Sequence, residues 1–107
     1  MREVPLVAFA AAHSDGAIVV DVREPGEYVR GHVPGATLVP MAQLPSRVHE
    51  LLKDTPVYLI CASGNRSLAM TNVLVRAGYD AYSVIGGTGA WTSAGHPVVM
   101  GSRRNAA

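Results

Sequence analysis

Short apolar runs alternate along the chain with stretches whose apolar residues recur at helical spacing. The runs are brief and bounded by Gly, Pro or Asp, which predicts buried strands. They cover residues 3–4, 17–20, 37–39, 57–60 and 81–85. The stretches between them predict helices over residues 6–12, 24–30, 44–52, 67–77 and 88–94.

Strands that alternate with helices favour right-handed crossovers, and therefore an α/β fold with a mostly parallel sheet and helices on both faces. In such a sheet, ligands bind outside the carboxyl ends of the strands. The chain shows no internal repeat, low-complexity tract or linker, so we expect residues 1–107 to form a single domain. Residues 4–98 would form its core, and residues 101–107 a frayed tail.

One loop at such a carboxyl end contains the only cysteine of the chain, Cys61. The run 57–60 leads into this loop, and the amphipathic stretch after it ends at Gly78. A helix N-terminus leaves backbone N–H groups unpaired, and a loop of small residues can turn its own N–H groups inward. We therefore expect Cys61 to lie in an anion-binding nest, with a pKa below the ordinary value of about 8.5.

Composition narrows the classes of function. The chain is 49% hydrophobic and only 6% aromatic, which indicates the aliphatic core of a sheet covered by helices. A net charge of +1 gives no electrostatic argument for nucleic acid or membrane partners. A single cysteine cannot form an internal disulfide, and the N-terminus has no signal-peptide core, so we expect a cytoplasmic protein.

Three motifs follow one another in the chain. The first joins residues 21–24 to 27–28 and 31–36, the second is residues 61–67, and the third joins residues 86–87 to 90–91. In this order and spacing they resemble the single-domain rhodaneses, a sulfurtransferase family, over residues 4–98. The resemblance implies a three-layer rhodanese-like fold with a mostly parallel five-stranded sheet, and a cysteine that carries sulfur as a persulfide.

The resemblance implies that Cys61 is the catalytic nucleophile. Its thiolate would take the outer sulfur of a donor such as thiosulfate, and the persulfide would pass to cyanide, a thiol or a protein dithiol. No metal or other cofactor is expected, and a thioredoxin-like protein or a desulfurase is a candidate partner. The residue after the cysteine is often basic in members that use thiosulfate; here it is Ala62, which leaves the natural donor open.

The residues after Cys61 are expected to form the substrate-binding loop: Ala62, Ser63, Gly64, Asn65, Arg66 and Ser67. Most would contribute backbone N–H groups rather than side chains, with Gly64 supplying a backbone angle that other residues resist. Arg66 would either hold the sulfonate end of a substrate or brace the loop through backbone carbonyls. Ser67 would cap the following helix with its hydroxyl.

Several residues outside the loop invite a catalytic interpretation for which a structural one is preferred. Asp21 and Arg23 follow a neighbouring strand and are expected to form an ion pair or to anchor a loop. His32 is expected to fix its turn by hydrogen bonds rather than to pair with the cysteine, and Trp91 to lie in the core. The other histidines show no metal-ligand spacing.

Two other functions remain open. Phosphatases and arsenate reductases resemble this architecture, but their loop has one residue more than the six of residues 61–66. A protein-binding module could use the same fold without turnover, although inactive members typically lack the cysteine. Loop length and the cysteine therefore favour sulfur transfer over both alternatives.

Overall fold

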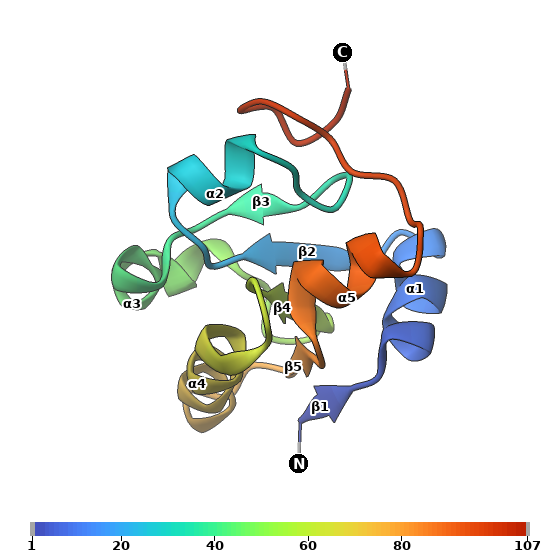
Figure 1. Ribbon diagram of the computed structural model, residues 1–107. Helices are drawn as coiled ribbons and strands as arrows, with labels where there is room; N and C mark the ends of the chain where they lie inside the picture. The colour runs from blue at the N-terminus through green and yellow to red at the C-terminus, as the bar shows by residue number, and fades with distance from the viewer. Residues whose placement is uncertain (1, 107) are drawn as a thin grey trace.

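The computed structural model describes residues 2–106, which form one sheet of five strands flanked by helices (Figure 1). The strand order is β1-β5-β4-β2-β3, and every pairing is parallel. The predicted α/β class and parallel sheet are thus confirmed. The strands are Glu3–Val4 (β1), Ile18–Asp21 (β2), Thr37–Leu38 (β3), Val57–Ile60 (β4) and Ala81–Val84 (β5).

Helices cover both faces of the sheet and bury a separate apolar cluster on each. On one face, α3 and α4 pack Leu44 and Leu74 against Leu59 of β4. On the other, α1, α2 and α5 bury Phe9, with Trp91 beside it as predicted. The helices are Leu6–Ser14 (α1), Pro25–Val29 (α2), Leu44–Arg47 (α3), Asn65–Arg76 (α4) and Gly87–Ser93 (α5).

The predicted helix over residues 44–52 is wrong in its extent. Only α3 is α-helical there, between the 3-10 turns η1 (Met41–Gln43) and η2 (Val48–Glu50). The α-helical part ends at Arg47, and Leu51 has already returned to extended backbone at φ −96° and ψ 152°. Leu44 reaches the core, whereas Leu52 is exposed, so the apolar spacing overstates the length of the helix.

Helix α4 begins two residues earlier than predicted, inside the motif itself. Its N-cap is Gly64, whose φ of +110° lies in the left-handed region. Ser67 therefore lies in the first turn of the helix, and the prediction that its hydroxyl caps the helix is wrong. At the other end, Gly78 follows the C-cap with a φ of +93°, which confirms the predicted stop.

The C-terminal segment lies against the turn that follows α2. Val99 forms an isolated antiparallel bridge with His32, and the N–H of Gly101 donates to the carbonyl of Val29 at 2.8 Å. Residues 101–106, within the range for which we predict fraying, are exposed. Even so, the carbonyl of Arg104 accepts a hydrogen bond of 2.8 Å from the N–H of Gly35.

The parallel arrangement brings the carboxyl ends of β2, β4 and β5 to one edge of the sheet. The loops that leave these strands lead to α2, α4 and α5 (Figure 1). Each of the three motifs thus begins at the same edge. Among residues 2–106, no helix combines the length and the apolar character needed to cross a membrane.

Candidate active site

The thiol of Cys61 lies in a turn of backbone N–H groups directly after β4. Its Sγ accepts hydrogen bonds from the N–H of Gly64 at 3.1 Å and from the N–H of Ser67 at 3.4 Å. The loop carries these donors inward because the left-handed Gly64 reverses the chain just before α4 begins. The sulfur is also well covered, since only 1% of Cys61 is exposed.

Two opposing effects act on the pKa of Cys61. Burial raises it, because removal from water disfavours the thiolate. Hydrogen bonds from the Ser67 hydroxyl and from the N–H groups of Ser67, Gly64 and Ser63 lower it. The hydrogen bonds outweigh burial, so the pKa of Cys61 is lowered below its ordinary value. The site therefore favours the ionised, nucleophilic form of the sulfur.

A pair of buried hydroxyl groups extends from the sulfur into the core. The Ser67 Oγ lies 3.4 Å from Sγ of Cys61 and 2.8 Å from the Oγ of Ser83 on β5. Both serines are buried. Sequence reasoning assigned no role to Ser83, although a signal was present: a serine stands within the apolar run 81–85 at a position that faces inward.

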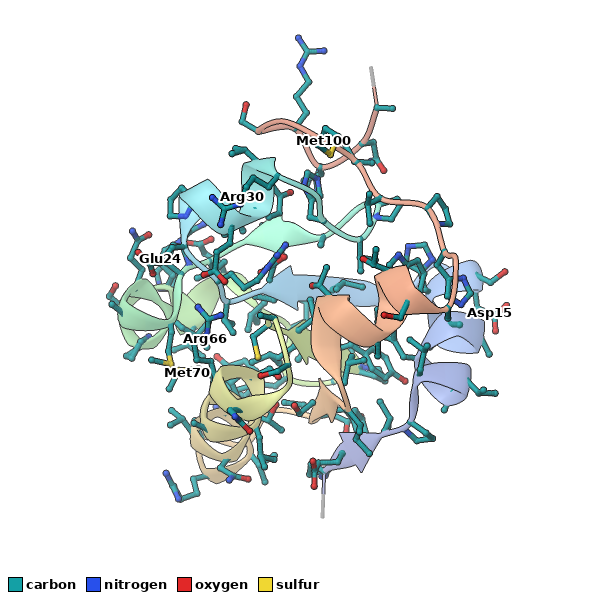
Figure 2. All side chains as sticks on the ribbon, in the orientation of Figure 1. Asp15, Glu24, Arg30, Arg66, Met70 and Met100 are labelled. Carbon is teal, nitrogen blue, oxygen red and sulfur yellow. The ribbon has the colours of Figure 1, made fainter. Side chains whose placement is uncertain are left out.

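Within residues 2–106 the Arg66 side chain makes no hydrogen bond to a backbone carbonyl of the loop, and its contact with a substrate stays a prediction. The guanidinium forms a two-pronged ion pair with Glu27 of α2, at 2.7 and 2.9 Å. Figure 2 shows Arg66 lying between α4 and α2. The Arg66 hydrogen bonds hold the pKa of Glu27 at about 2, and the pKa of Arg66 is raised in turn. Glu27 belongs to the first motif, and the structure shows that it ties that motif to the cysteine loop.

The third motif holds the loop from the other side. The N–H of Thr88 donates to the carbonyl of Cys61 at 2.8 Å, and the N–H of Gly89 to that of Ala62 at 3.0 Å. This contact requires Gly87, because a Cβ there would collide with the Cys61 carbonyl oxygen and lie 2.8 Å from the carbonyl carbon of Ala62. Two glycines, 86 and 87, let α5 begin directly against the loop.

Asp21 and Arg23 form the structural ion pair that we predict. Both are buried, and the Arg23 Nη2 lies 2.8 Å from the Asp21 Oδ2. The same Nη2 donates to the carbonyl of Gly31, also at 2.8 Å. The pair thus fixes the path from β2 through α2 to the following turn.

His32 fixes its turn by hydrogen bonds, also as predicted. The imidazole stacks on the Tyr28 ring with centroids 3.6 Å apart. Its Nδ1 lies 2.9 Å from the carbonyl oxygen of Tyr28, and its Nε2 lies 3.2 Å from that of Arg104. Each nitrogen therefore faces a backbone carbonyl rather than the cysteine.

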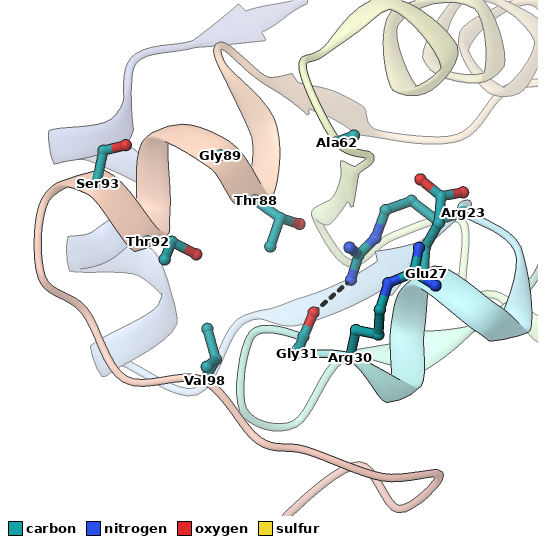
Figure 3. A pocket seen from close by; sticks show the side chains of 10 residues that line it. All are labelled: Arg23, Glu27, Arg30, Gly31, Ala62, Thr88, Gly89, Thr92, Ser93 and Val98. Atoms are coloured by element: carbon teal, nitrogen blue, oxygen red, sulfur yellow. Dashed lines mark hydrogen bonds between the residues drawn. The ribbon is translucent and has the colours of Figure 1, made fainter.

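The remaining loop residues form the outer surface of the nest. Ser63 and Asn65 are exposed, and Ala62 is half-buried. Ala62 borders a pocket of about 490 Å³ that opens between α2 and α5 (Figure 3). The pocket joins residues of all three motifs, including Arg23 and Thr88. In residues 2–106, His, Cys, Asp and Glu form no cluster that could hold a metal ion.

A parallel α/β sheet with a cysteine that accepts hydrogen bonds from backbone N–H groups at its carboxyl edge defines the class of fold and site. Comparison with known families agrees with this class. The model of the rhodanese-like domain matches residues 7–94. The chain therefore belongs to the rhodanese-like domain family, as its motifs suggest.

Individual relatives agree with this assignment. The chain is 36% identical over 89 residues to a protein named sulfurtransferase from Allochromatium vinosum, covering 82% of this chain and 83% of the relative. A rhodanese-related protein from Thermoplasma volcanium has a similar structure, with a TM-score of 0.87 and 31% identity over 92% of this chain and 98% of that one. A rhodanese-like domain protein from Staphylococcus aureus has a TM-score of 0.85 and 30% identity over 95% of this chain and 100% of that one.

Proposed function

We propose that this protein is a sulfurtransferase of the thiosulfate or persulfide type, with Cys61 as the sulfur carrier. The observation that carries the proposal is the pair of N–H donors, from Gly64 and Ser67, aimed at a thiol with a lowered pKa. A nucleophilic sulfur that must hold a negative charge in two successive forms needs such fixed donors. The sulfurtransferase name of the Allochromatium vinosum relative supports the same function.

In the first half-reaction, the Cys61 thiolate attacks the outer sulfur of the donor. With thiosulfate, a new S–S bond forms at Cys61, the S–S bond of the donor breaks, and its electron pair leaves with sulfite. In the second, an acceptor nucleophile takes that outer sulfur and returns the electron pair to Cys61. The charge balances in each step, so neither needs a metal or a redox cofactor.

The outer sulfur of the persulfide needs donors of its own. The N–H groups of Asn65 and Arg66 begin α4, where a helix has no acceptor for them within its own backbone. Within residues 2–106 these two N–H groups make no hydrogen bond, and they lie in sequence between the two donors that bind Sγ. We assign them to the outer sulfur, which gives Asn65 and Arg66 a binding role through the backbone.

The cover over Cys61 means that the donor cannot reach the sulfur in the closed loop. Cys61 is only 1% exposed, whereas Ser63 on the same loop is exposed. Exposure of Sγ requires a movement that breaks some of the loop's contacts, because Gly64 caps α4 and the N–H of Gly89 holds the Ala62 carbonyl. Sulfur loading therefore includes an opening step before the chemistry.

Intact-mass measurement tests the proposal. We expect incubation with thiosulfate, or with a low-molecular-weight persulfide, to add one sulfur atom that cyanide then removes. The Cys61→Ser variant should fold normally and gain nothing. A wild-type protein that gains no sulfur from either donor would refute the proposal and favour a protein-binding module. Hydrolysis of a chromogenic phosphate ester would favour a phosphatase instead.

A further inference from the structure

The pocket beside the cysteine loop is larger than the proposed reaction with small ions requires. Its volume of about 490 Å³ falls in the range of sites for organic molecules, about 300–1,000 Å³. It also adjoins the reacting residue, because the N–H of Thr88, which lines it, bonds the Cys61 carbonyl at 2.8 Å. A molecule in this pocket would thus lie next to the loop that carries the sulfur.

One polar group at this pocket has no partner. Thr88 is only 7% exposed, and its hydroxyl makes no hydrogen bond within residues 2–106. Figure 3 shows the Thr88 side chain directed from α5 toward the space that Arg23 enters from the opposite side. A rotation of χ1 by about 120° moves the hydroxyl to the position that the methyl group now occupies, so the hydroxyl can serve a ligand in the pocket. A buried hydroxyl left unpaired is costly, and a bound acceptor removes that cost.

The opposite wall supplies positive charge. Arg23 directs Nε and Nη2 at Asp21 and Gly31, while its Nη1 makes no hydrogen bond within the described residues. Arg30 lines the same pocket, is exposed and has no ion-pair partner in that part of the chain. The acidic side chains nearby, Asp21 and Glu27, are already paired with arginines. The pocket therefore favours an anionic ligand.

We propose that Thr88 and Arg23 form a carboxylate-binding subsite that orients a small organic thiol as the sulfur acceptor. This inference rests on the proposed sulfur transfer. The carboxylate would accept hydrogen bonds from the Thr88 hydroxyl and from Nη1 of Arg23, with Arg30 at the rim. The carbon skeleton would lie toward Val98, the apolar end of the pocket. Thr88 thereby becomes a residue that determines acceptor specificity.

The reaction in this arrangement balances. The acceptor thiol loses its proton to solvent, and its sulfur bonds the outer sulfur of the Cys61 persulfide. The S–S bond to Cys61 breaks, and its electron pair returns to Sγ as the thiolate. The product is an organic persulfide, with no net oxidation or reduction of the pair.

Acceptors that differ only in the carboxylate test the subsite. N-acetylcysteine and its carboxamide have nearly the same size, and cyanide fills no pocket. We expect Thr88→Val to lower the rate constant for transfer to N-acetylcysteine about tenfold, as loss of one hydrogen bond to a charged group does. Transfer to the carboxamide should fall by a smaller factor, because its neutral oxygen accepts a weaker hydrogen bond, and transfer to cyanide should stay at the wild-type rate. An equal effect on all three acceptors, or none, overturns the subsite.

Thr71→Val is the matched control. Thr71 also has a buried hydroxyl without a partner, but it lies on α4 and does not line the pocket. The same change there should leave the preference for the carboxylate intact. A loss of that preference in Thr71→Val would assign the effect to general repacking and overturn the subsite.

A binding measurement separates this inference from the proposed function. S-methyl-N-acetylcysteine cannot accept sulfur, so calorimetry reports its binding alone. We expect Thr88→Val to weaken its binding about tenfold and to weaken that of the corresponding carboxamide by a smaller factor. If the protein never loads sulfur, the proposed function fails and this measurement alone decides the subsite. Equal binding by both proteins overturns it.

Discussion

The Ser67 hydroxyl has one proton, and several neighbouring atoms could accept a hydrogen bond from it. When the thiol is neutral, Sγ donates to the Ser67 Oγ, and the hydroxyl is free to donate to the carbonyl of Gly64 at 3.2 Å. When the sulfur is ionised, Ser67 must donate to it instead. The Ser67 Oγ then accepts from the Ser83 hydroxyl at 2.8 Å. Gly64 keeps a donor, because the Leu68 N–H also bonds its carbonyl.

Ser83 should therefore stabilise the thiolate without touching it. We expect Ser83→Ala to raise the pKa of Cys61 by about 0.5–1, since a hydrogen bond contributes about 0.5–1.5 kcal/mol and 1.4 kcal/mol corresponds to one pKa unit. The thiolate fraction falls accordingly at any pH below the new pKa. The measurement is the pH dependence of the rate of alkylation by iodoacetamide, over the pH range in which the protein stays folded.

The matched variant for this experiment is again Thr71→Val, which removes a buried hydroxyl that makes no hydrogen bond to Sγ or to either serine within residues 2–106. Its alkylation midpoint should equal that of the wild type. If Ser83→Ala left the midpoint in place, the hydroxyl pair would have no part in holding the charge.

The residue types in the loop predicted its chemistry, but they did not predict its individual contacts as well. Small residues after a strand indicated inward N–H groups, and Gly64 and Ser67 supply them. The ion pair between Arg66 and Glu27 joins residues 39 positions apart. Local spacing carries no information on such a contact, because the packing of α2 beside α4 decides it. Local spacing also carries no information on the contact of Ser83 with Ser67, because it depends on the position of β5 beside the loop.

Among the elements, α5 does most to define the loop. Its first turn bonds the carbonyls of Cys61 and Ala62, which leaves those groups no freedom to rotate outward. The close approach depends on Gly87, whose φ of +57° also lies in the left-handed region. The Gly-Gly pair in the sequence thus allows the short distance between α5 and the loop.

Gly87→Ala should displace the loop more than it destabilises the fold. A Cβ would meet backbone atoms of Cys61 and Ala62, which cannot move aside as a flexible side chain can. We expect a loss of sulfur transfer of at least about 10²-fold, because a displacement of about 1 Å in a reacting group costs that much. Stability should fall by about 1–3 kcal/mol from backbone strain.

The measurements are transfer to cyanide and urea unfolding of the same preparation. Gly95→Ala is the control, since Gly95 has a similar φ of +85° and open space around it. That variant should lose stability through strain alone and keep its transfer rate. Equal transfer by both variants would show that the contact of α5 with the loop is unnecessary.

Helices and strands could be predicted from the sequence where a single pattern of apolar residues and stop signals determines them. The strands and α4 follow from apolar runs and stop signals, and they appear within one or two residues of the predicted limits. The prediction for segment 44–52 failed because the chain changes to a 3-10 turn at Val48 and to extended backbone at Leu51, although the apolar spacing continues. There the side chains reach the core from short turns, so burial does not require a continuous helix.

At the scale of the whole molecule, the C-terminal segment closes the structure over the turn after α2. The carbonyl of Arg104 lies within bonding distance of Gly35 and His32, and Gly101 bonds Val29. These contacts join residues about 70 positions apart. Val98, just before them, forms one end of the pocket.

Removal of residues 101–107 should destabilise the protein by about 1.5–4.5 kcal/mol, the net value of these three hydrogen bonds. Urea unfolding measures the difference as a lower midpoint with a similar slope. Arg104→Ala is the control, because it removes the charge and keeps the backbone carbonyl, and it should behave as the wild type. An unchanged midpoint in the truncated protein would mean that the segment does not stabilise the turn.

The sheet as a whole was predictable in its class, since alternating elements imply parallel crossovers. Its strand order was not, because alternation fits more than one order and only packing selects β1-β5-β4-β2-β3. The path of the C-terminal segment escaped prediction for a similar reason. Backbone carbonyls hold it in place, and they carry no signature in the sequence.

The two outermost strands, β1 and β3, contain two residues each. An outer strand with free backbone groups is where a second molecule can add its own strand and begin an aggregate. Outer strands of two residues offer too few N–H and C=O groups to bind an added strand. Crowded solutions of the protein should therefore resist β-type aggregation, and self-association would have to use side-chain surfaces instead.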